Sequence, residues 1–305
     1  MPKLLKRILS VVAVLIALAA AGIAGVIGVD SFGMSGRLDA VTNTRIANAK
    51  GPEIRAYVVR PATPGPHPAI IMVHEFWGVR SDLQGKADDL AARGYLVVAP
   101  DLFRGRTTNS VPSAIYNVVS NPPEQVDVDV DAVYQWLAQQ PDVQANRIAI
   151  MGFCFGGGAA IRYSVTNPKL AATIVFYGMP ITEAQKLKGL SGPVLGIFGG
   201  ADTSIPVDSV RAFEASLKSA GVVNEISIYD GEPHAFVKDM DGIRAGGAQG
   251  QAWEQLVNFL EAHLKHSAGV VRSASEQTPD RRLDVGYLLR LAYEHAFGGH
   301  AGHGG

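Results

Sequence analysis

The chain is almost without cysteine, because Cys154 is the single cysteine among 305 residues. One thiol cannot form an internal disulfide, so the fold has to be stable without one. The chain also lacks a surplus of charge of either sign, since its formal net charge is -1. Nucleic-acid-binding proteins carry basic surfaces, so this balance gives no electrostatic case for a nucleic-acid partner.

Three common cofactor and metal motifs are also missing. Residues 74–78 do not form a zinc-binding His-Glu-x-x-His motif, because Gly78 stands at the position of the second ligand. The glycines at 156–158 are not followed by the Lys-Ser/Thr pair of a phosphate loop and lack dinucleotide-site spacing. We therefore expect no cofactor and no metal. The remaining candidates for metal ligands are three histidines near the end of the chain: His295, His300 and His303. The simpler interpretation of that segment is a Gly-rich tail that binds no metal.

The N-terminal segment is basic and then apolar. Lys3, Lys6 and Arg7 precede an apolar run over residues 8–29, and about 20 such residues are enough to cross a bilayer. The basic flank is expected to stay in the cytoplasm. We therefore predict that residues 1–30 form a membrane anchor and that the working domain is extracytoplasmic. A cleaved signal peptide, followed by secretion, is the alternative.

The remainder divides into a linker with a first strand region (31–50), a main domain (51–266) and a polar tail (267–305), in which residues 283–297 have amphipathic helical spacing. Within the domain, short apolar runs typical of buried strands alternate with segments of helical spacing. The predicted strands cover residues 54–59, 69–73, 95–99, 148–151, 171–176, 193–198 and 225–229. The predicted helices cover residues 81–93, 126–137, 207–220 and 251–264, and one more follows Cys154. Residues 105–123 show no clear period and predict a loop. This order favours an α/β fold, with a mostly parallel, doubly wound sheet and helices on both faces.

One strand ends in a turn that is typical of an enzyme nucleophile. Gly152, Cys154 and Gly156 fit the Gly-x-nucleophile-x-Gly pattern, in which a strand bends sharply into a helix. The glycines let the backbone pass close to its neighbours, so that the middle residue can occupy a strained corner. The helix that follows favours a thiolate through its dipole. The alternative is that Cys154 is a small buried hydrophobic residue.

Reactive side chains follow four of the predicted strands, and ligands in such sheets bind at the carboxyl ends of strands. These residues are Glu75, Cys154, Asp202 and His234. The order nucleophile, acid, histidine is that of α/β-hydrolases. An imidazole can take the thiol proton, and a carboxylate can orient the imidazole. Taken singly, Asp202 can also be a turn carboxylate and His234 a loop histidine.

At these positions the sequence resembles dienelactone hydrolase (carboxymethylenebutenolidase), over residues 52–265. The motifs that carry the resemblance are Gly152–Gly157, Gly199–Asp202, Pro233–Phe236, His74–Gly78 and Ala99–Phe103. The resemblance implies an α/β-hydrolase fold and a Cys154–His234–Asp202 triad. It also implies that Glu75 helps to activate the nucleophile, and that the backbone amides of Phe76 and Phe155 form the oxyanion hole.

The resemblance further implies two cationic side chains that hold a substrate carboxylate. The first is Arg104 or Arg106, and the second falls on Lys238, which lacks the planar fork of arginine. Trp77 is expected to line the pocket, with core packing as the alternative. We therefore expect a hydrolase of a small ester or lactone that works through a thioester. A membrane-tethered binding protein that has kept the fold without the reaction is the alternative.

Overall fold

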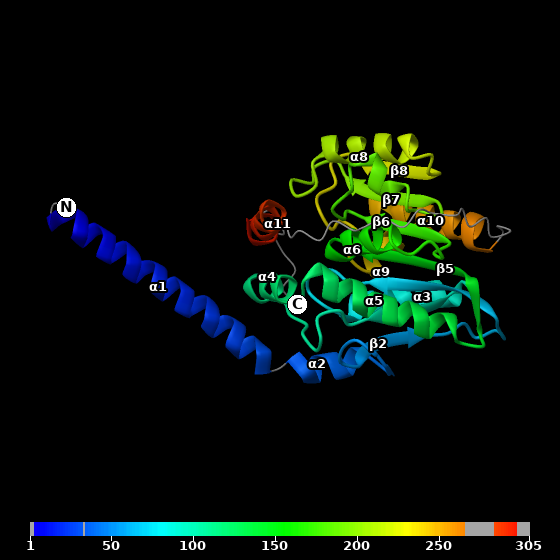
Figure 1. The fold of residues 1–305 in the computed structure, drawn as a ribbon, viewed down its shortest axis with the longest axis horizontal. Coiled ribbons are helices and arrows are strands. Elements are labelled where there is room, and N and C mark those ends of the chain that lie inside the picture. Colours follow the sequence, from blue (N-terminus) through cyan, green and yellow to red (C-terminus); the bar gives the residue numbers. More distant parts are fainter. Residues whose placement is uncertain (1–2, 33, 266–283, 298–305) are drawn as a thin grey trace.

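The computed structural model describes residues 3–32, 34–265 and 284–297, and an eight-stranded sheet forms its centre (Figure 1). The strands lie in the order β1-β2-β4-β3-β5-β6-β7-β8. Their bounds are β1 Thr44–Ile46, β2 Ile54–Val59, β3 His67–Val73, β4 Leu96–Pro100, β5 Val143–Phe153, β6 Ala172–Phe176, β7 Val194–Gly199 and β8 Asn224–Tyr229. β2 pairs antiparallel with β1 and β4, and all other neighbours pair parallel. The predicted mostly parallel α/β sheet is therefore confirmed.

The central strands are continuous apolar runs because helices cover both of their faces. Every residue of β3, β4, β6 and β7 is buried. The helices are α1 Lys3–Phe32, α2 Met34–Val41, α3 Ser81–Ala92, α4 Val111–Ser120, α5 Pro123–Ala138, α6 Phe155–Ser164, α7 Ala184–Leu187, α8 Val207–Ser219, α9 Met240–Ala245, α10 Gly247–Leu260 and α11 Val285–Phe297. A short π-helix, Glu261–Lys265, extends α10.

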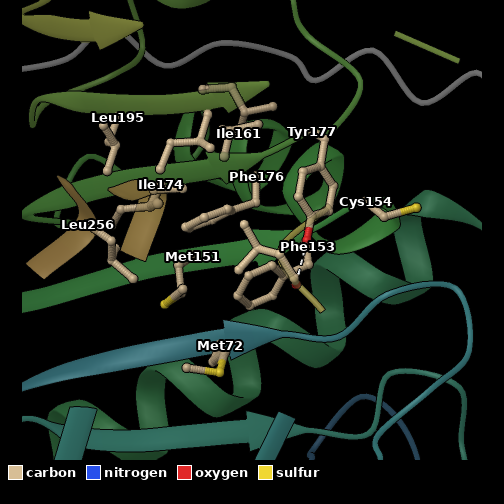
Figure 2. Packing of buried hydrophobic residues seen from close by; sticks show 14 of the residues in the cluster. Met72, Met151, Phe153, Cys154, Ile161, Ile174, Phe176, Tyr177, Leu195 and Leu256 are labelled. Atoms are coloured by element: carbon tan, nitrogen blue, oxygen red, sulfur yellow. Dashed lines mark hydrogen bonds between the residues drawn. The ribbon is translucent and has the colours of Figure 1, made fainter. Parts of the chain in front are cut away.

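Two hydrophobic clusters lie on opposite faces of the sheet. In the first, Leu256 of α10 packs with Met151 and Phe153 of β5, as Figure 2 shows. In the second, Val130 of α5 packs with Ile150, the strand residue next to Met151. Successive side chains of a strand point to opposite faces, so β5 contributes to both clusters. The doubly wound arrangement holds β5, and with it the turn at Cys154, at the centre of the molecule.

The N-terminal segment departs from the predicted membrane anchor. Residues 3–32 form the long helix α1, which extends from the body of the protein in Figure 1. Within the described part of the chain, however, no helix has the length and apolar character needed to cross a membrane. The C-terminal end of α1 is bound to the domain, because Asp30 pairs with Arg37 at 2.8 Å and accepts a hydrogen bond from Thr108. The predicted anchor is thus not supported, and the extracytoplasmic location stays a prediction.

Two segments that were predicted to be irregular contain helices. Part of residues 31–50 forms α2, and part of residues 105–123 forms α4. The buried face of α4 includes two polar residues, Ser113 and Asn117. Because these polar side chains face inward while Tyr116 and Val119 are exposed, the apolar residues of this segment do not mark its buried face.

Candidate active site

Cys154 lies at a sharp corner between β5 and α6. Its backbone has a φ of 52° and a ψ of -115°, a conformation that residues other than glycine rarely adopt. The corner requires the flanking glycines. A Cβ on Gly152 would lie 2.1 Å from the carbonyl oxygen of Gly156, and a Cβ on Gly156 would lie 2.4 Å from that of Val73. The strand-to-helix turn therefore places the sulfur at the carboxyl edge of the sheet.

His234 and Asp202 form a buried pair at the same edge. Nδ1 of His234 lies 2.7 Å from Oδ2 of Asp202, and both side chains are almost fully buried. The other oxygen of Asp202 accepts hydrogen bonds of 2.8 Å from the amides of Ser204 and Ile205. The carboxylate is thus fixed by its own loop and in turn fixes the ring of His234. Nε2 of His234 is buried and has no hydrogen-bond partner among the described residues.

The surroundings of His234 change the pKa of its ring. Burial lowers the pKa of His234, but the neighbouring Cys154 and the hydrogen bond that His234 donates to Asp202 together raise that pKa well above its ordinary value. Both neighbours of the His234 ring therefore favour its protonated form. The three side chains come from the turns after β5, β7 and β8, and the sheet brings them together.

Glu75 lies in the turn after β3, near the buried Lys86. Its side chain lines a small cavity with Lys86 and Asp82. Burial raises the pKa of Glu75, and the positive charge of Lys86 opposes that rise. Lys86 itself donates a hydrogen bond of 2.6 Å to the carbonyl of Lys238. Within the described residues, the carboxyl of Glu75 makes no hydrogen bond to Cys154, although it lies close enough to influence His234.

The two expected oxyanion-hole residues lie on either side of the nucleophile. Phe155 is the first residue of α6, so its amide has no acceptor in a preceding helical turn. Phe76 is fully buried in the loop after β3. The neighbouring His74 holds this loop, because Nδ1 lies 2.6 Å from the carbonyl of Glu75 and Nε2 accepts from the amide of Leu102 at 3.2 Å. Burial lowers the pKa of His74 to about 4, so the ring is neutral and structural.

A cavity of about 490 Å³ opens beside Cys154. Apolar side chains dominate its lining, among them Phe155, Met179, Ile181, Leu288 and Leu291. Two cations, Arg162 and Lys186, also border it. Each of these has an acidic partner at hydrogen-bond distance: Asp127 for Arg162 at 2.9 Å and Glu183 for Lys186 at 3.2 Å.

The predicted substrate-binding cations lie elsewhere. Arg104 forms an ion pair of 3.2 Å with Asp129. Arg106 covers the ring of Tyr116 at 5.1 Å, and Lys238 is exposed. None of the three lines the cavity at Cys154. Trp77, which was expected to line the pocket, packs on Phe76 with ring centroids 4.3 Å apart and borders the small cavity of Glu75 instead.

The C-terminal helix α11 contributes to the site, which sequence reasoning missed. The hydroxyl of Tyr287 lies 3.8 Å from Sγ of Cys154. Glu294, about two helical turns after Tyr287 on α11, accepts hydrogen bonds from the amides of Thr203 at 3.2 Å and Ser204 at 3.0 Å. The amphipathic spacing of residues 283–297 was the one available signal, and it indicated a helix without indicating its partner.

Two carboxylates and the imidazole of His234 lie close enough together to be considered as metal ligands. Ligand atoms of Asp202, His234 and Glu294 lie within 4.8 Å of one another. Both oxygens of Asp202 already accept hydrogen bonds from His234 and from backbone amides. Both oxygens of Glu294 likewise accept from the loop after Asp202. Hydrogen bonds within the protein are therefore sufficient to explain why these three groups lie close together.

Known proteins share this fold and this stretch of sequence. The model of the dienelactone hydrolase family matches residues 54–264. A "putative carboxymethylenebutenolidase" of Yersinia pestis is 32% identical over 231 residues, which cover 70% of this chain and 86% of that protein. A protein of the same name from Salmonella typhimurium is 33% identical over 228 residues, with coverage of 70% and 84%.

Solved structures give the same result. A "putative dienelactone hydrolase" from Klebsiella pneumoniae has a TM-score of 0.63 and 30% identity, covering 73% of this chain and 97% of that one. A thermophilic esterase from Thermogutta terrifontis, with a TM-score of 0.58 and 18% identity over 73% of this chain and 94% of its own, shares the fold. Helix α11 lies beyond the residues that match the family. From its sheet, its turn at Cys154 and these matches, the chain belongs to the dienelactone hydrolase family of α/β-hydrolases.

Proposed function

We propose that this hydrolase opens a lactone or cleaves a small carboxylic ester through a thioester acyl-enzyme on Cys154. The observation that carries the proposal is the convergence of three side chains at one edge of the sheet. His234 and Asp202 form a buried pair of 2.7 Å, and Cys154 lies near enough to His234 to raise the pKa of its ring. Nε2 of His234 is buried and has no hydrogen-bond partner among the described residues, which leaves this nitrogen available to accept a proton.

Acylation begins with the proton of Cys154 on Nε2 of His234. The thiolate attacks the carbonyl carbon, and the carbonyl oxygen becomes an oxyanion that the amides of Phe76 and Phe155 stabilise. The carbon–oxygen bond of the ester then breaks. His234 gives its proton to the departing alkoxide, which leaves as an alcohol, or stays attached when the substrate is a lactone. Asp202 keeps the imidazole oriented and stabilises its charge throughout.

Deacylation repeats these steps with water as the nucleophile. His234 takes a proton from water, and the resulting hydroxide attacks the thioester carbon. The second tetrahedral intermediate collapses and breaks the carbon–sulfur bond, which releases the acid and returns Cys154 as a thiolate. The proton on His234 restores the starting ion pair, so that each cycle consumes one ester and one water. We assign Glu75 an accessory role, because its carboxyl influences His234 from the neighbouring turn.

The test is the hydrolysis of p-nitrophenyl acetate and of a simple γ-lactone by the full chain and by Cys154→Ala. We expect turnover to fall to the uncatalysed level in the variant, and mass spectrometry to detect an acyl adduct on Cys154 of the wild-type protein during turnover. His234→Asn should behave in the same way. The matched control is His263→Asn, because His263 pairs with Glu225 at the start of β8, away from the carboxyl edge. Unchanged turnover in Cys154→Ala would refute the proposal and favour a binding protein.

A further inference from the structure

One face of α11 is turned toward the active site. Tyr287, Leu288, Leu291 and Glu294 are each at most 9% exposed, and their spacing of one, four and seven residues is that of a single helical face. Leu289, on the other side of the helix, is 67% exposed. The helix is therefore oriented with respect to the site, and its inner face carries both apolar and polar contacts.

Polar contacts hold α11 at two separate parts of the site. At its beginning, the amide of Tyr287 donates to Asp284 at 2.9 Å, and the hydroxyl of Tyr287 lies 3.8 Å from the sulfur of Cys154. Near its end, Glu294 accepts from the amides of Thr203 and Ser204, the two residues that follow Asp202. Because these contacts reach Cys154 and the loop after Asp202, the helix has a defined position beside both parts of the site.

The apolar part of this face closes the cavity beside Cys154. Leu288 and Leu291 line that cavity from α11, and Met179 and Ile181 line it from the loop after β6. The cations at its border, Arg162 and Lys186, are engaged by acidic partners. A substrate carboxylate would thus enter a largely apolar space that also contains the acidic Glu183 and Asp284, and whose two cations are already paired, which is energetically unfavourable.

We propose that α11 is a specificity element, whose inner face walls the cavity beside Cys154 and thereby selects neutral esters or lactones with an apolar acyl group. The proposal rests on the proposed thioester reaction for its chemistry, but the shape of the cavity can be tested separately. Leu291 is the residue on which the size of the cavity depends most directly, because it is 1% exposed and lies one helical turn from Tyr287. Each methylene group that the cavity takes up is expected to raise kcat/KM about fourfold.

The first experiment uses the full chain and p-nitrophenyl esters from acetate to octanoate, with the charged p-nitrophenyl hemisuccinate as a comparison. The wild-type protein should prefer the butyrate over the hemisuccinate by about tenfold or more. Leu291→Trp, which fills the cavity, should shift the preferred acyl chain to a shorter length, and Leu291→Ala should shift it to a longer one. The matched control Leu289→Ala should leave the ratios within about twofold of wild type. A chain-length profile that neither substitution at 291 changes would overturn the proposal, as would a preference for the hemisuccinate.

A second measurement separates this proposal from the proposed reaction. Cys154 is the single cysteine of the chain, so the rates of its alkylation by N-ethylmaleimide and N-cyclohexylmaleimide report on access through the cavity. Leu291→Ala should raise the rate with the bulky reagent relative to the small one, and Leu291→Trp should lower it. If no ester is hydrolysed but these ratios change as stated, the reaction is wrong and the role of α11 stands. If esters are hydrolysed and neither the ester profile nor the ratios respond, α11 is not the wall of the site.

Discussion

Adding one methyl group at the turn should distinguish a glycine that the nucleophile requires from one that it does not. In Gly156→Ala the new Cβ would lie 2.4 Å from the carbonyl oxygen of Val73 and 2.6 Å from that of His74. Both contacts are with backbone, so relief requires the strand end to move. In Gly158→Ala, two residues further along α6, the nearest atoms belong to Met179 at 3.5 Å, an ordinary van der Waals distance.

The magnitudes follow from these distances. Overpacking costs about 1–3 kcal/mol, and with rigid backbone on both sides we expect about 3 kcal/mol for Gly156→Ala. Alanine gains about 1 kcal/mol over glycine within a helix, which leaves a net loss of about 2 kcal/mol. Gly158→Ala has only the gain of about 1 kcal/mol. For a domain of this size the melting temperature should fall by about 4–8 °C in the first variant and rise by about 2–4 °C in the second.

Thermal unfolding followed by circular dichroism, together with urea unfolding, measures both shifts on the full chain. Ester hydrolysis is the second readout, because movement of the chain at Val73 and His74 displaces the loop that carries Phe76. Gly156→Ala should therefore also lose activity at temperatures at which it is fully folded. Equal stability of the two variants would show that the turn at Cys154 is looser than its close contacts indicate, and the argument for a strained nucleophile would fail.

Two further predictions concern the carboxylates around His234. Asp202→Asn should lower kcat by about 10⁴-fold, because an amide favours the wrong tautomer of the imidazole. The control Asp230→Asn, on an exposed turn, should have no such effect. Steady-state kinetics measure both variants, and a small loss of kcat in Asp202→Asn would contradict the triad. Burial raises the pKa of Glu294, but its hydrogen bonds from Ser204 and Thr203 lower it below its usual value. The stability that Glu294 contributes is therefore present above its unfolded pKa and is lost as the pH falls through its folded pKa. Glu294→Gln should lower the free energy of unfolding by about 1–3 kcal/mol at neutral pH, and the difference should shrink in acid; a difference that does not depend on pH would refute this.

The sheet could be predicted because its strands are buried on both faces. Runs such as residues 69–73 and 148–151 contain almost only apolar side chains, and few other structures require this. The order of the reactive residues was equally informative, because each follows a strand and the carboxyl ends of parallel strands meet at one edge. His234 and Asp202 are 32 residues apart in the sequence, yet the topology alone predicted that they would be neighbours.

Contacts that depend on tertiary packing could not be predicted in this way. Arg104 looked available for a substrate, but a buried carboxylate, Asp129, engages it from α5. Helix α4 was missed because its buried face includes the polar Ser113 and Asn117, while some of its apolar residues are exposed. The contact of Tyr287 with Cys154 joins residues 133 positions apart, and no periodicity contains information about such a pair.

The proposed reaction and the proposed choice of substrate depend on different parts of this chain. The proposed nucleophile, base and acid lie on turns directly after strands, where close contacts and hydrogen bonds of the backbone restrict their positions. The cavity is bordered by segments that connect or follow the sheet: the end of α4, the loop after β6 and α11. Segments of this kind tolerate change, since the fold does not depend on them. Substitutions on the inner face of α11 should therefore alter which acyl groups are accepted while the reactive groups keep their geometry. Substitutions at Gly156 should do the reverse and impair every substrate alike.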